Sequence, residues 1–513
     1  MTSPSPDPVD LRVHAQYRRD FTEEADVVVV GSGPGGAVVA KELTDAGVRV
    51  VLLEEGPPFT PADFEADGGI SMARTMREGG LRTTRGTVMP TMQAIALGGG
   101  SLVNSAICVR SPEFVLDRWC ADYDLERTAR ADLESHYDAV GEFIGISPTP
   151  DEVQGPRNLL FRDGCDVLGY ESEPISRNVR GCRGSGECFT GCRSRAKQSM
   201  DITYVPAALR GGATVLTSVR VEGVLCEGSR ATGVEGTVVE PLTGRATHRF
   251  RVNAKVVVLA AGCMATPVLL QKSGNLANGS GQVGENLRFH PGVAVMGIFP
   301  DEVNPRFGAT QGMQSLQFVS QGFKLETLWA PPAIPAVRLP GSAMELKERL
   351  SLLPYAAIWD AIGSCNRSIG RVRPRRRGLD PVLSWRLQPD DVGILTSALL
   401  RLAEIFFAAG AHSVLPGVNG LAPEMRSLEE AQVLRTHPVR STDLVVSGNH
   451  AFCTTRMHGD PTRGVVDESG RCHDLDNLYV ADTGVFPECP SVNPMWTGMA
   501  IAHRTAGAIA DRV

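Results

Sequence analysis

The sequence has no long apolar run and no excess of basic residues. Because no stretch of about 20 apolar residues occurs, we expect no transmembrane helix. The net charge of −7 at pH 7 gives no electrostatic reason to expect nucleic-acid binding. The first residues lack the apolar core and cleavage pattern of a secretory signal. Twelve cysteines without an export signal therefore predict reduced thiols in a cytoplasmic protein.

The sequence does contain a strand, a glycine-rich turn, a helix and a second strand in succession between residues 26 and 56. The predicted elements are a strand at 27–30, a helix at 37–45 and a strand at 48–53. The first run is apolar and β-branched, which is typical of a buried parallel strand. The turn GSGPGG that follows it places Gly31, Gly33 and Gly36 in a G-x-G-x-x-G pattern.

Each glycine of this turn has a physical task in binding a dinucleotide. Gly31 permits the tight turn, Gly33 lets a pyrophosphate approach the backbone, and Gly36 lets helix and strand pack closely. The helix N-terminus offers N–H donors to the phosphates. Glu54 lies 23 positions after Gly31, where a carboxylate can accept hydrogen bonds from a ribose. The motif predicts an NAD or FAD site and does not choose between the two.

Two further segments carry glycine or polar residues that suit a binding site. LGGGSLVN has glycines at 98–100, then Ser101 and Asn104; its backbone can approach a ligand, although an ordinary turn explains it as well. His450 stands in a predicted loop, and Asn493 follows 43 positions later, directly before a proline. The proline favours a helix start with Asn493 as N-cap. A lone histidine is more often structural than catalytic, so only its companions make His450 a candidate.

The rest of the chain alternates between strand-like, helical and irregular segments. Further predicted elements are helices at 112–145, 343–362 and 391–409, strands within 213–260, a strand ending at Asp482, and a C-terminal helix after Asn493. Residues 295–445 carry many prolines and differ in composition from the rest. We interpret them as a separate region that covers the substrate.

Seven ordered stretches, spread over nearly the whole chain, resemble the glucose–methanol–choline (GMC) family of FAD-dependent oxidoreductases. They lie at 31–56, 97–112, 217–225, 257–274, 283–291, 450–457 and 478–502. In that order they resemble the family's FAD-binding opening, its glycine-rich flavin loop, its adenine-contacting strand, a signature stretch, a return segment, and the catalytic and C-terminal FAD segments.

The resemblance implies an α/β fold (α+β overall). A Rossmann-like FAD-binding domain would carry an inserted substrate domain built on an antiparallel sheet with helices. The implied parts are an N-terminal tail at 1–24, a discontinuous FAD-binding domain at 25–290 and 445–513 with a cysteine loop near 181–199, and a substrate-binding domain at 291–444. The implied FAD contacts are Gly31, Gly33, Pro34, Gly35, Gly36, Glu54, Glu55, Gly98, Gly99, Gly100, Ser101, Asn104, Val221, Ala261, Gly262, Asp482, Thr483, Asn493, Pro494, Met495 and Thr497.

The resemblance also implies an activity, the oxidation of a small-molecule alcohol to a carbonyl. Hydride would pass to flavin N5, and oxygen or another acceptor would reoxidise the flavin. By resemblance His450 is the base and Asn493 its partner. Imidazole can accept a hydroxyl proton near neutral pH, and an amide can stabilise developing alkoxide charge. His458 is the reserve candidate for the base, whereas His290 and His503 suit packing or surface roles.

The substrate is less well defined by the sequence. Residues 325–364 are rich in leucine, proline, alanine and aromatics, which suits a hydrophobic lid over a lipophilic alcohol and, equally, ordinary core packing. Three alternatives stay open: a lyase on the same fold without net redox, an electron-transferring dehydrogenase with an iron–sulfur cluster, and, from the first motif alone, an NAD-dependent dehydrogenase. The electron acceptor and the oligomeric state do not follow from the sequence.

Two departures from the family pattern and one cysteine loop bear on the chemistry. Cys453 replaces a small glycine and could narrow the space beside the flavin or change the access of oxygen. Val103 stands where some members tether the flavin through a histidine, so we expect non-covalent FAD. Cys182, Cys188 and Cys192 could hold zinc or an iron–sulfur cluster. Their C-x5-C-x3-C spacing fits no common cluster. We therefore expect no metal, and a compact loop near the substrate entrance that could be redox-sensitive.

Overall fold

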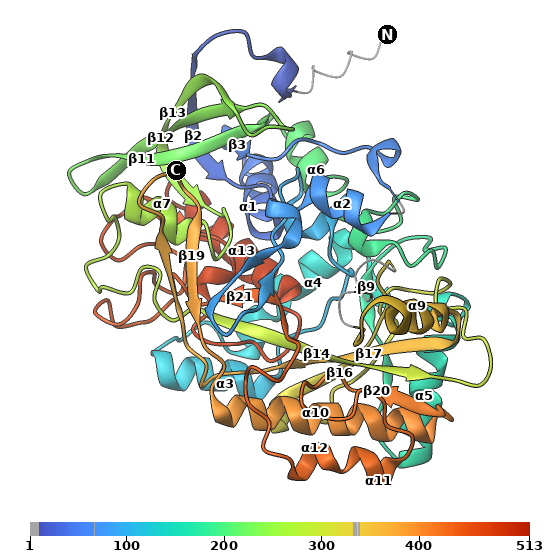
Figure 1. The fold of residues 1–513 in the computed structure, drawn as a ribbon. Coiled ribbons are helices and arrows are strands. Elements are labelled where there is room, and N and C mark those ends of the chain that lie inside the picture. Colours follow the sequence, from blue (N-terminus) through green and yellow to red (C-terminus); the bar gives the residue numbers. More distant parts are fainter. Residues whose placement is uncertain (1–9, 66, 332–335, 337–338) are drawn as a thin grey trace.

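Two large β-sheets organise the protein, one of eight strands and one of nine, and helices cover their faces (Figure 1). The computed structural model describes residues 10–65, 67–331, 336 and 339–513. Residues 1–9 of the predicted tail, and residues 332–335 and 337–338 of the predicted lid, lie outside the described part. The mixture of sheets and helices is the α/β class that the sequence predicts.

The eight-stranded sheet is built mainly from parallel strands. Its order is β1 (Leu11–Arg12), β10 (Thr214–Thr217), β3 (Val50–Glu54), β2 (Phe21–Val30), β13 (Ala246–Leu259), β12 (Arg230–Val239) and β11 (Val219–Glu227), with β22 (Leu478–Val480) paired to β13. The pairs from β1 through β13, and the pair of β13 with β22, are parallel, whereas β11, β12 and β13 pair antiparallel. The first and last strands of the chain therefore belong to one sheet.

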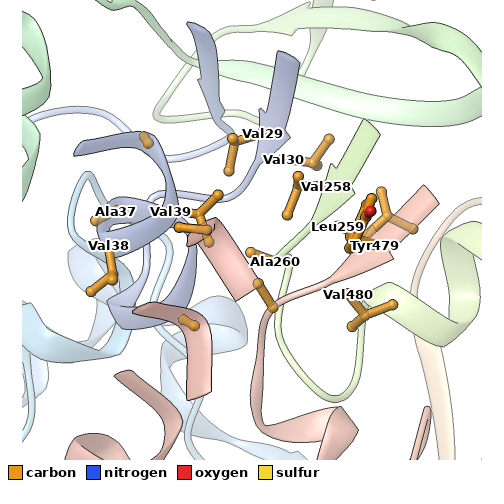
Figure 2. Close-up of a cluster of buried hydrophobic side chains, with 14 of the residues drawn as sticks. Val29, Val30, Ala37, Val38, Val39, Val258, Leu259, Ala260, Tyr479 and Val480 are labelled. Atoms are coloured by element: carbon orange, nitrogen blue, oxygen red, sulfur yellow. The ribbon is translucent and has the colours of Figure 1, made fainter. Parts of the chain in front are cut away.

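Helix α1 (Pro34–Asp45) packs on β2 and β3 and against α13 (Met495–Ala510). Figure 2 shows Val29 and Val258 of the strands beside Val39 of α1, all fully buried. Parallel strands covered by helices are apolar on both faces, which explains the unbroken valine run. The helical layer continues through α6 (Tyr204–Arg210), α4 (Arg130–Ile144) and α3 (Glu113–Tyr123).

Two predicted boundaries in this unit shift toward the N-terminus. β2 begins at Phe21 rather than at residue 27, because its polar first half pairs with residues 250–254 of β13. α1 begins at Pro34 rather than at residue 37, since a proline suits the first position of a helix. The glycine turn is therefore shorter than the sequence suggests, and the helix N-terminus comes directly after Gly33.

The nine-stranded sheet is mainly antiparallel, as the resemblance implies for the substrate region. Its order is β4 (Arg82–Thr83), β6 (Pro90–Thr91), β21 (Ser447–Phe452), β14 (Arg288–Ile298), β17 (Ala356–Gly363), β16 (Phe323–Leu328), β15 (Met313–Ser315) and β8 (Glu173–Pro174), with β20 (Ser413–Leu415) paired to β14. Helix α10 (Pro389–Ala408) packs across β14, β16 and β17 (Figure 1). The predicted helix at 391–409 is thus present.

The single helix predicted at 343–362 is wrong. Helix α9 spans Ala343–Ser351, a short turn contains Pro354, and strand β17 follows at Ala356–Gly363. The proline removes a backbone donor and limits the helix. All residues of β17 are buried between β14 and β16, and a short apolar run of this kind does not distinguish strand from helix by its periodicity.

The remaining elements are short helices and the strands of two small sheets, β18-β19-β5 and β7-β9. They are α2 (Gly68–Thr75), α5 (Pro156–Leu168), α7 (Thr266–Lys272), α11 (Leu428–Ala431), α12 (Val433–Thr436), β5 (Arg85–Gly86), β7 (Ile146–Pro148), β9 (Ser176–Asn178), β18 (Arg371–Pro374) and β19 (Pro381–Trp385). The predicted helix at 112–145 is two helices, α3 and α4, separated at Asp124, whose φ of 52° is left-handed. Among the described residues, no helix has the length and apolar character needed to cross a membrane.

Candidate active site

A cavity of about 820 Å³ is lined by residues of both sheets. The predicted FAD contacts that line it are Gly31, Gly33, Pro34, Gly35, Glu54, Glu55, Gly99, Gly100, Asn104, Val221, Ala261, Gly262, Asp482, Thr483, Asn493, Pro494 and Met495. The predicted contacts outside the lining are Gly36, Gly98, Ser101 and Thr497. Val103 also lines it, with a side chain that offers no atom for a covalent link to flavin. The structure thus brings together segments from residue 31 to residue 495.

Close backbone packing shapes the glycine turn after β2. A Cβ at Gly31, whose φ is +103°, would lie 2.3 Å from the Ala260 oxygen, and one at Gly36 would lie 1.9 Å from the Gly31 oxygen. Gly33 differs, because the described part of the chain places no atom within 4 Å of its Cβ position. A Cβ at Gly99 would lie 2.7 Å from Gly33 Cα, so the two glycine loops meet. The open side of Gly33 fits a pyrophosphate at the N-terminus of α1.

Glu54, at the end of β3, is buried at the edge of the cavity. Its carboxylate accepts hydrogen bonds from Ser32 N (3.0 Å) and Ser32 Oγ (2.6 Å), and burial raises its pKa. Ser32 Oγ in turn accepts from Gly98 N (2.9 Å), which ties the first glycine loop to the second. Glu55 also lines the cavity, but it is paired with Arg77 at 2.7 Å. Both acidic residues are therefore fixed beside the place expected for a ribose.

A buried lysine that sequence analysis missed holds the second glycine loop. Lys197 Nζ donates to the carbonyl oxygens of Leu102 (2.6 Å), Asn104 (2.8 Å) and Cys188 (2.9 Å). Burial lowers the pKa of Lys197 to about 8. Because Leu102 and Asn104 lie 95 and 93 residues before Lys197, no local pattern reveals this contact.

His450 lies on strand β21, so the loop predicted around it is wrong. It lines the cavity, and its Nδ1 lies 3.1 Å from Nδ1 of His290 on the neighbouring strand β14. Burial lowers the pKa of His450 to about 4 and that of His290 well below its usual value. Both imidazoles are therefore neutral near pH 7. The packing role expected for His290 includes direct contact with the candidate base.

Asn493 lies in the segment that leads into α13. The helix N-cap is Pro494 rather than Asn493, so the predicted capping role is wrong. Asn493 Oδ1 instead accepts a hydrogen bond from Lys324 Nζ at 2.7 Å, and Lys324 forms an ion pair with Glu326 at 2.6 Å. Asn493 and Glu326 both line the cavity. His450 and Asn493 thus meet at one cavity although 43 residues separate them.

Two other predicted contacts order the backbone near His450. Asp482 accepts hydrogen bonds from Gly262 N (3.0 Å) and Thr266 Oγ1 (2.6 Å), and burial raises its pKa. Thr483 Oγ1 donates to the Ala451 oxygen (2.7 Å), next to His450 on β21. Asp482 therefore joins the end of β22 to the turn after β13, and Thr483 fixes β21.

The other candidate histidines lie outside the cavity lining. His458, the reserve base, is buried, and its Nδ1 accepts a hydrogen bond from Asp460 N at 2.9 Å. His503 on α13 lies 2.9 Å from His136 of α4 through their Nδ1 atoms. Both residues have packing partners, and neither meets Asn493 at the cavity.

Cys453 does not line the cavity, although it was expected to narrow the space beside the flavin or to change the access of oxygen. It is buried in the apolar core under β21, outside the cavity lining, and adopts a left-handed φ of +75°. Burial raises the pKa of its thiol to about 11, so the thiol is protonated near neutral pH. The side chain therefore neither narrows the cavity nor adds charge to it.

The three loop cysteines line one small cavity with Arg177 and Lys197. Cys188 Sγ accepts a hydrogen bond from Arg177 Nη2 at 3.2 Å. Burial raises the pKa of Cys188, but the positive charges of Arg177 and Lys197 outweigh this and lower it overall. All 12 cysteines are free, and the described residues contain no group of three or more His, Cys, Asp or Glu side chains arranged to hold a metal ion.

Comparison with known proteins agrees with this geometry. Two models described as GMC oxidoreductase match residues 72–292 and 367–502, and an FAD-binding-domain model matches residues 24–85. An uncharacterised GMC-type oxidoreductase of Mycobacterium tuberculosis is 34% identical over 500 residues, covering 95% of this chain and 76% of that protein. A long-chain-alcohol oxidase of Arabidopsis thaliana is 27% identical over 95% of this chain and 68% of its own length.

A solved structure has the same fold. Pyridoxine 4-oxidase from Mesorbium loti superposes with a TM-score of 0.73 at 20% identity, over 95% of this chain and 100% of that one. The two glycine loops, the buried Glu54 at the end of β3 and the open side of Gly33 fit FAD. The resemblance stated from the sequence is confirmed. The chain belongs to the GMC oxidoreductase family and is an FAD-dependent oxidoreductase.

Proposed function

We propose that this protein oxidises a lipophilic alcohol to a carbonyl, with His450 as the base and Asn493 as its polar partner. The observation that supports this most is that both side chains line the cavity formed by the two glycine loops. When bound there, FAD supplies the hydride acceptor at flavin N5. The protein's own task is then to bind the alcohol, orient it and take its hydroxyl proton.

His450 suits the proton transfer. When Nδ1–H of His450 donates to Nδ1 of His290, the Nε2 lone pair of His450 is left to accept a proton. The lowered pKa of His450 keeps this lone pair available near neutral pH. Asn493 offers an amide at the same cavity, where an N–H donor can stabilise the negative charge that develops on the alcohol oxygen.

The cavity lining contains both polar and apolar side chains. Gln311, Glu326 and Asn493 line it near the candidate base, whereas Phe189, Leu328 and Ile362 add apolar surface. This distribution suits a hydroxyl group attached to a hydrocarbon. The similarity to a long-chain-alcohol oxidase supports the same substrate class. We propose oxygen or another electron acceptor for reoxidation, non-covalent FAD, and a cytoplasmic location.

Two alternatives compete with the proposed oxidation. An electron-transferring dehydrogenase with an iron–sulfur cluster needs clustered ligands, and no such group is found in the described part of the chain. A lyase on the same fold would leave the flavin oxidised during turnover. Reduction of the flavin by an alcohol therefore separates the proposed oxidation from the lyase reaction.

The replacement His450→Ala tests the assignment of the base. We expect the variant to keep its flavin absorption and to slow flavin reduction by an alcohol by about 10²- to 10⁴-fold, the usual contribution of a general base. The matched control is His458→Ala, because His458 lies outside the cavity lining. Normal flavin reduction in His450→Ala, or an equal loss in both variants, would contradict the assignment.

A further inference from the structure

Three buried polar side chains, Gln311, Glu326 and Lys324, connect the antiparallel sheet to Asn493. Gln311 Nε2 donates to Glu326 Oε1 (2.8 Å), and Lys324 Nζ donates to Glu326 Oε2 (2.6 Å). Lys324 Nζ also donates to Asn493 Oδ1 (2.7 Å). Lys324 is 0% exposed, so bulk water does not reach these contacts from behind. Gln311, Glu326 and Asn493 line the cavity, whereas Lys324 lies behind its lining.

The lysine decides which way the Asn493 amide points. An ammonium group has three donors and no acceptor, so it holds the amide through Oδ1 and leaves the donor Nδ2 to face elsewhere. Because Asn493 lines the cavity, Nδ2 is then available to a ligand there. We propose that Lys324 is a positioning residue that holds Asn493 so that Nδ2 donates to the oxygen of the reacting alcohol. This inference rests on the proposed function, because it identifies the residue that holds Asn493, one of the two side chains proposed to act on the alcohol.

The energetics of the ion pair favour a geometric role. Taking two charges out of water costs free energy that their attraction often fails to recover, so a buried ion pair is weak evidence for stability. The negative charge of Glu326 balances the positive charge of Lys324, and Gln311 donates a hydrogen bond to the same carboxylate. The positively charged Lys324 contacts Asn493, and Asn493 is proposed to contact the alcohol oxygen, on which negative charge develops as the alcohol loses its proton. The arrangement holds one amide orientation without adding net charge.

A purely structural role is the competing explanation. Lys324 joins β16 to the segment before α13, 169 residues later, and such a link could simply fasten the two parts. The two explanations predict different effects of replacing the lysine. Loss of a structural link affects stability and FAD content, whereas loss of an orienting group also changes how the cavity binds a negatively charged oxygen.

The test uses the FAD-loaded enzyme and replaces the ion pair as a unit. In Lys324→Met/Glu326→Gln, the donor to Asn493 is lost without leaving an unpaired buried charge. Lys324→Arg is the matched control, because it keeps a cation that can only donate. Acetate is the probe, since its carboxylate oxygen stands in for the negatively charged alcohol oxygen. Its binding is followed by the change in flavin absorption, and flavin reduction is measured separately in anaerobic stopped flow.

We expect the double variant to keep its FAD and to bind acetate about tenfold more weakly, because a charge-stabilising donor is no longer held in place. Flavin reduction should slow by about 100-fold, the lower end of the cost of losing one oxyanion donor. Alcohol affinity should change much less than the reduction rate. Lys324→Arg should stay close to the wild-type enzyme in all three measurements.

If the double variant loses its FAD, Lys324→Gln/Glu326→Gln is used instead. A glutamine at position 324 fits the same space, but it can turn either its amide oxygen or its amide nitrogen toward Asn493. The same direction of change is expected. The inference would be overturned if the variant that keeps FAD bound acetate and reduced its flavin as the wild-type enzyme does. It would also be overturned if acetate did not change the flavin absorption of the wild-type enzyme. If no alcohol reduces the wild-type flavin, the proposed function fails, yet the acetate titration still decides the role of Lys324.

Discussion

At the scale of single residues, burial sets the protonation state of the candidate base. The pKa of His450 is lowered to about 4, first by burial and further by the charge of Lys324, against the opposing effect of Glu326. An exposed histidine has a pKa of about 6.5. The neutral imidazole that the proposed reaction requires is therefore present throughout the neutral range.

This burial predicts an unusual pH dependence. Because His450 must be neutral to accept the proton, its activity is lost only as the pH falls through its lowered pKa. The second-order rate constant for flavin reduction by the alcohol should be constant from neutral pH down to about pH 5 and should fall around pH 4. Stopped-flow reduction measured across this range checks the prediction. A midpoint between pH 6 and 7 would show a base with an ordinary pKa, at odds with the burial of His450.

The position of Cys453 allows a second prediction at this scale. Glycine accepts the φ of +75° without strain, and the thiol lies outside the cavity lining. Cys453→Gly should therefore leave both flavin reduction by the alcohol and flavin reoxidation by oxygen unchanged. Rapid-mixing measurements of the two half-reactions decide it. A clear change in reoxidation alone would show that the cysteine does control the access of oxygen.

Sequence reasoning selected His450 and Asn493 as candidates, but it could not find the residues that contact them. The two residues stand in local motifs, and a local motif is readable from the chain. His290 lies 160 residues from His450, and Lys324 lies 169 residues from Asn493. These contacts depend on the register of β14 with β21 and on where β16 meets the C-terminal segment. The spacing of residues along the sequence does not reveal which distant strands pair.

At the scale of elements, the turn between β2 and α1 separates the demands of folding from those of cofactor binding. Gly31→Ala would force an alanine into a φ of +103° and press its Cβ against the Ala260 oxygen. Such strain costs about 1–3 kcal/mol before the overlap is counted. Gly33 has a φ of −64°, which alanine adopts readily, and its Cβ would point into open space.

The two replacements should therefore behave differently. Gly31→Ala should lower the thermal stability of the apoprotein, whereas Gly33→Ala should leave it near that of the wild type and weaken FAD binding. Thermal unfolding of the apoproteins and titration with FAD measure the two effects. Unchanged FAD affinity in Gly33→Ala would mean that the pyrophosphate does not approach this backbone.

Strand β17 shows where prediction of elements reaches its limit. Residues 356–363 form a short apolar run, and only their neighbours β14 and β16 make them a strand. In contrast, the run before Gly31 was predicted correctly, because the glycine turn and the following helix mark it as part of a strand–turn–helix unit. Local signals thus sufficed for the FAD-binding opening, and tertiary pairing decided the antiparallel sheet.

At the scale of the whole molecule, FAD binding and folding are coupled. The cavity is lined by residues from Val30 near the start of the chain to Gly498 near its end, so we expect a bound cofactor to contact both sheets. A ligand that binds the folded state alone adds about 2.7 kcal/mol when its free concentration is about 100-fold above its Kd. Removal of FAD should lower the Tm, and added FAD should restore it. A Tm that does not depend on FAD would contradict this coupling.

The proposed oxidation requires that an alcohol reduces the bound flavin. The most direct measurement is an absorption spectrum of the purified protein, followed by anaerobic addition of primary and secondary alcohols that include long-chain and sterol-like ones. We predict a flavin spectrum that a lipophilic alcohol bleaches. Admission of air then shows whether oxygen is the acceptor. A colourless protein, or a flavin that no alcohol bleaches, would contradict the proposed function.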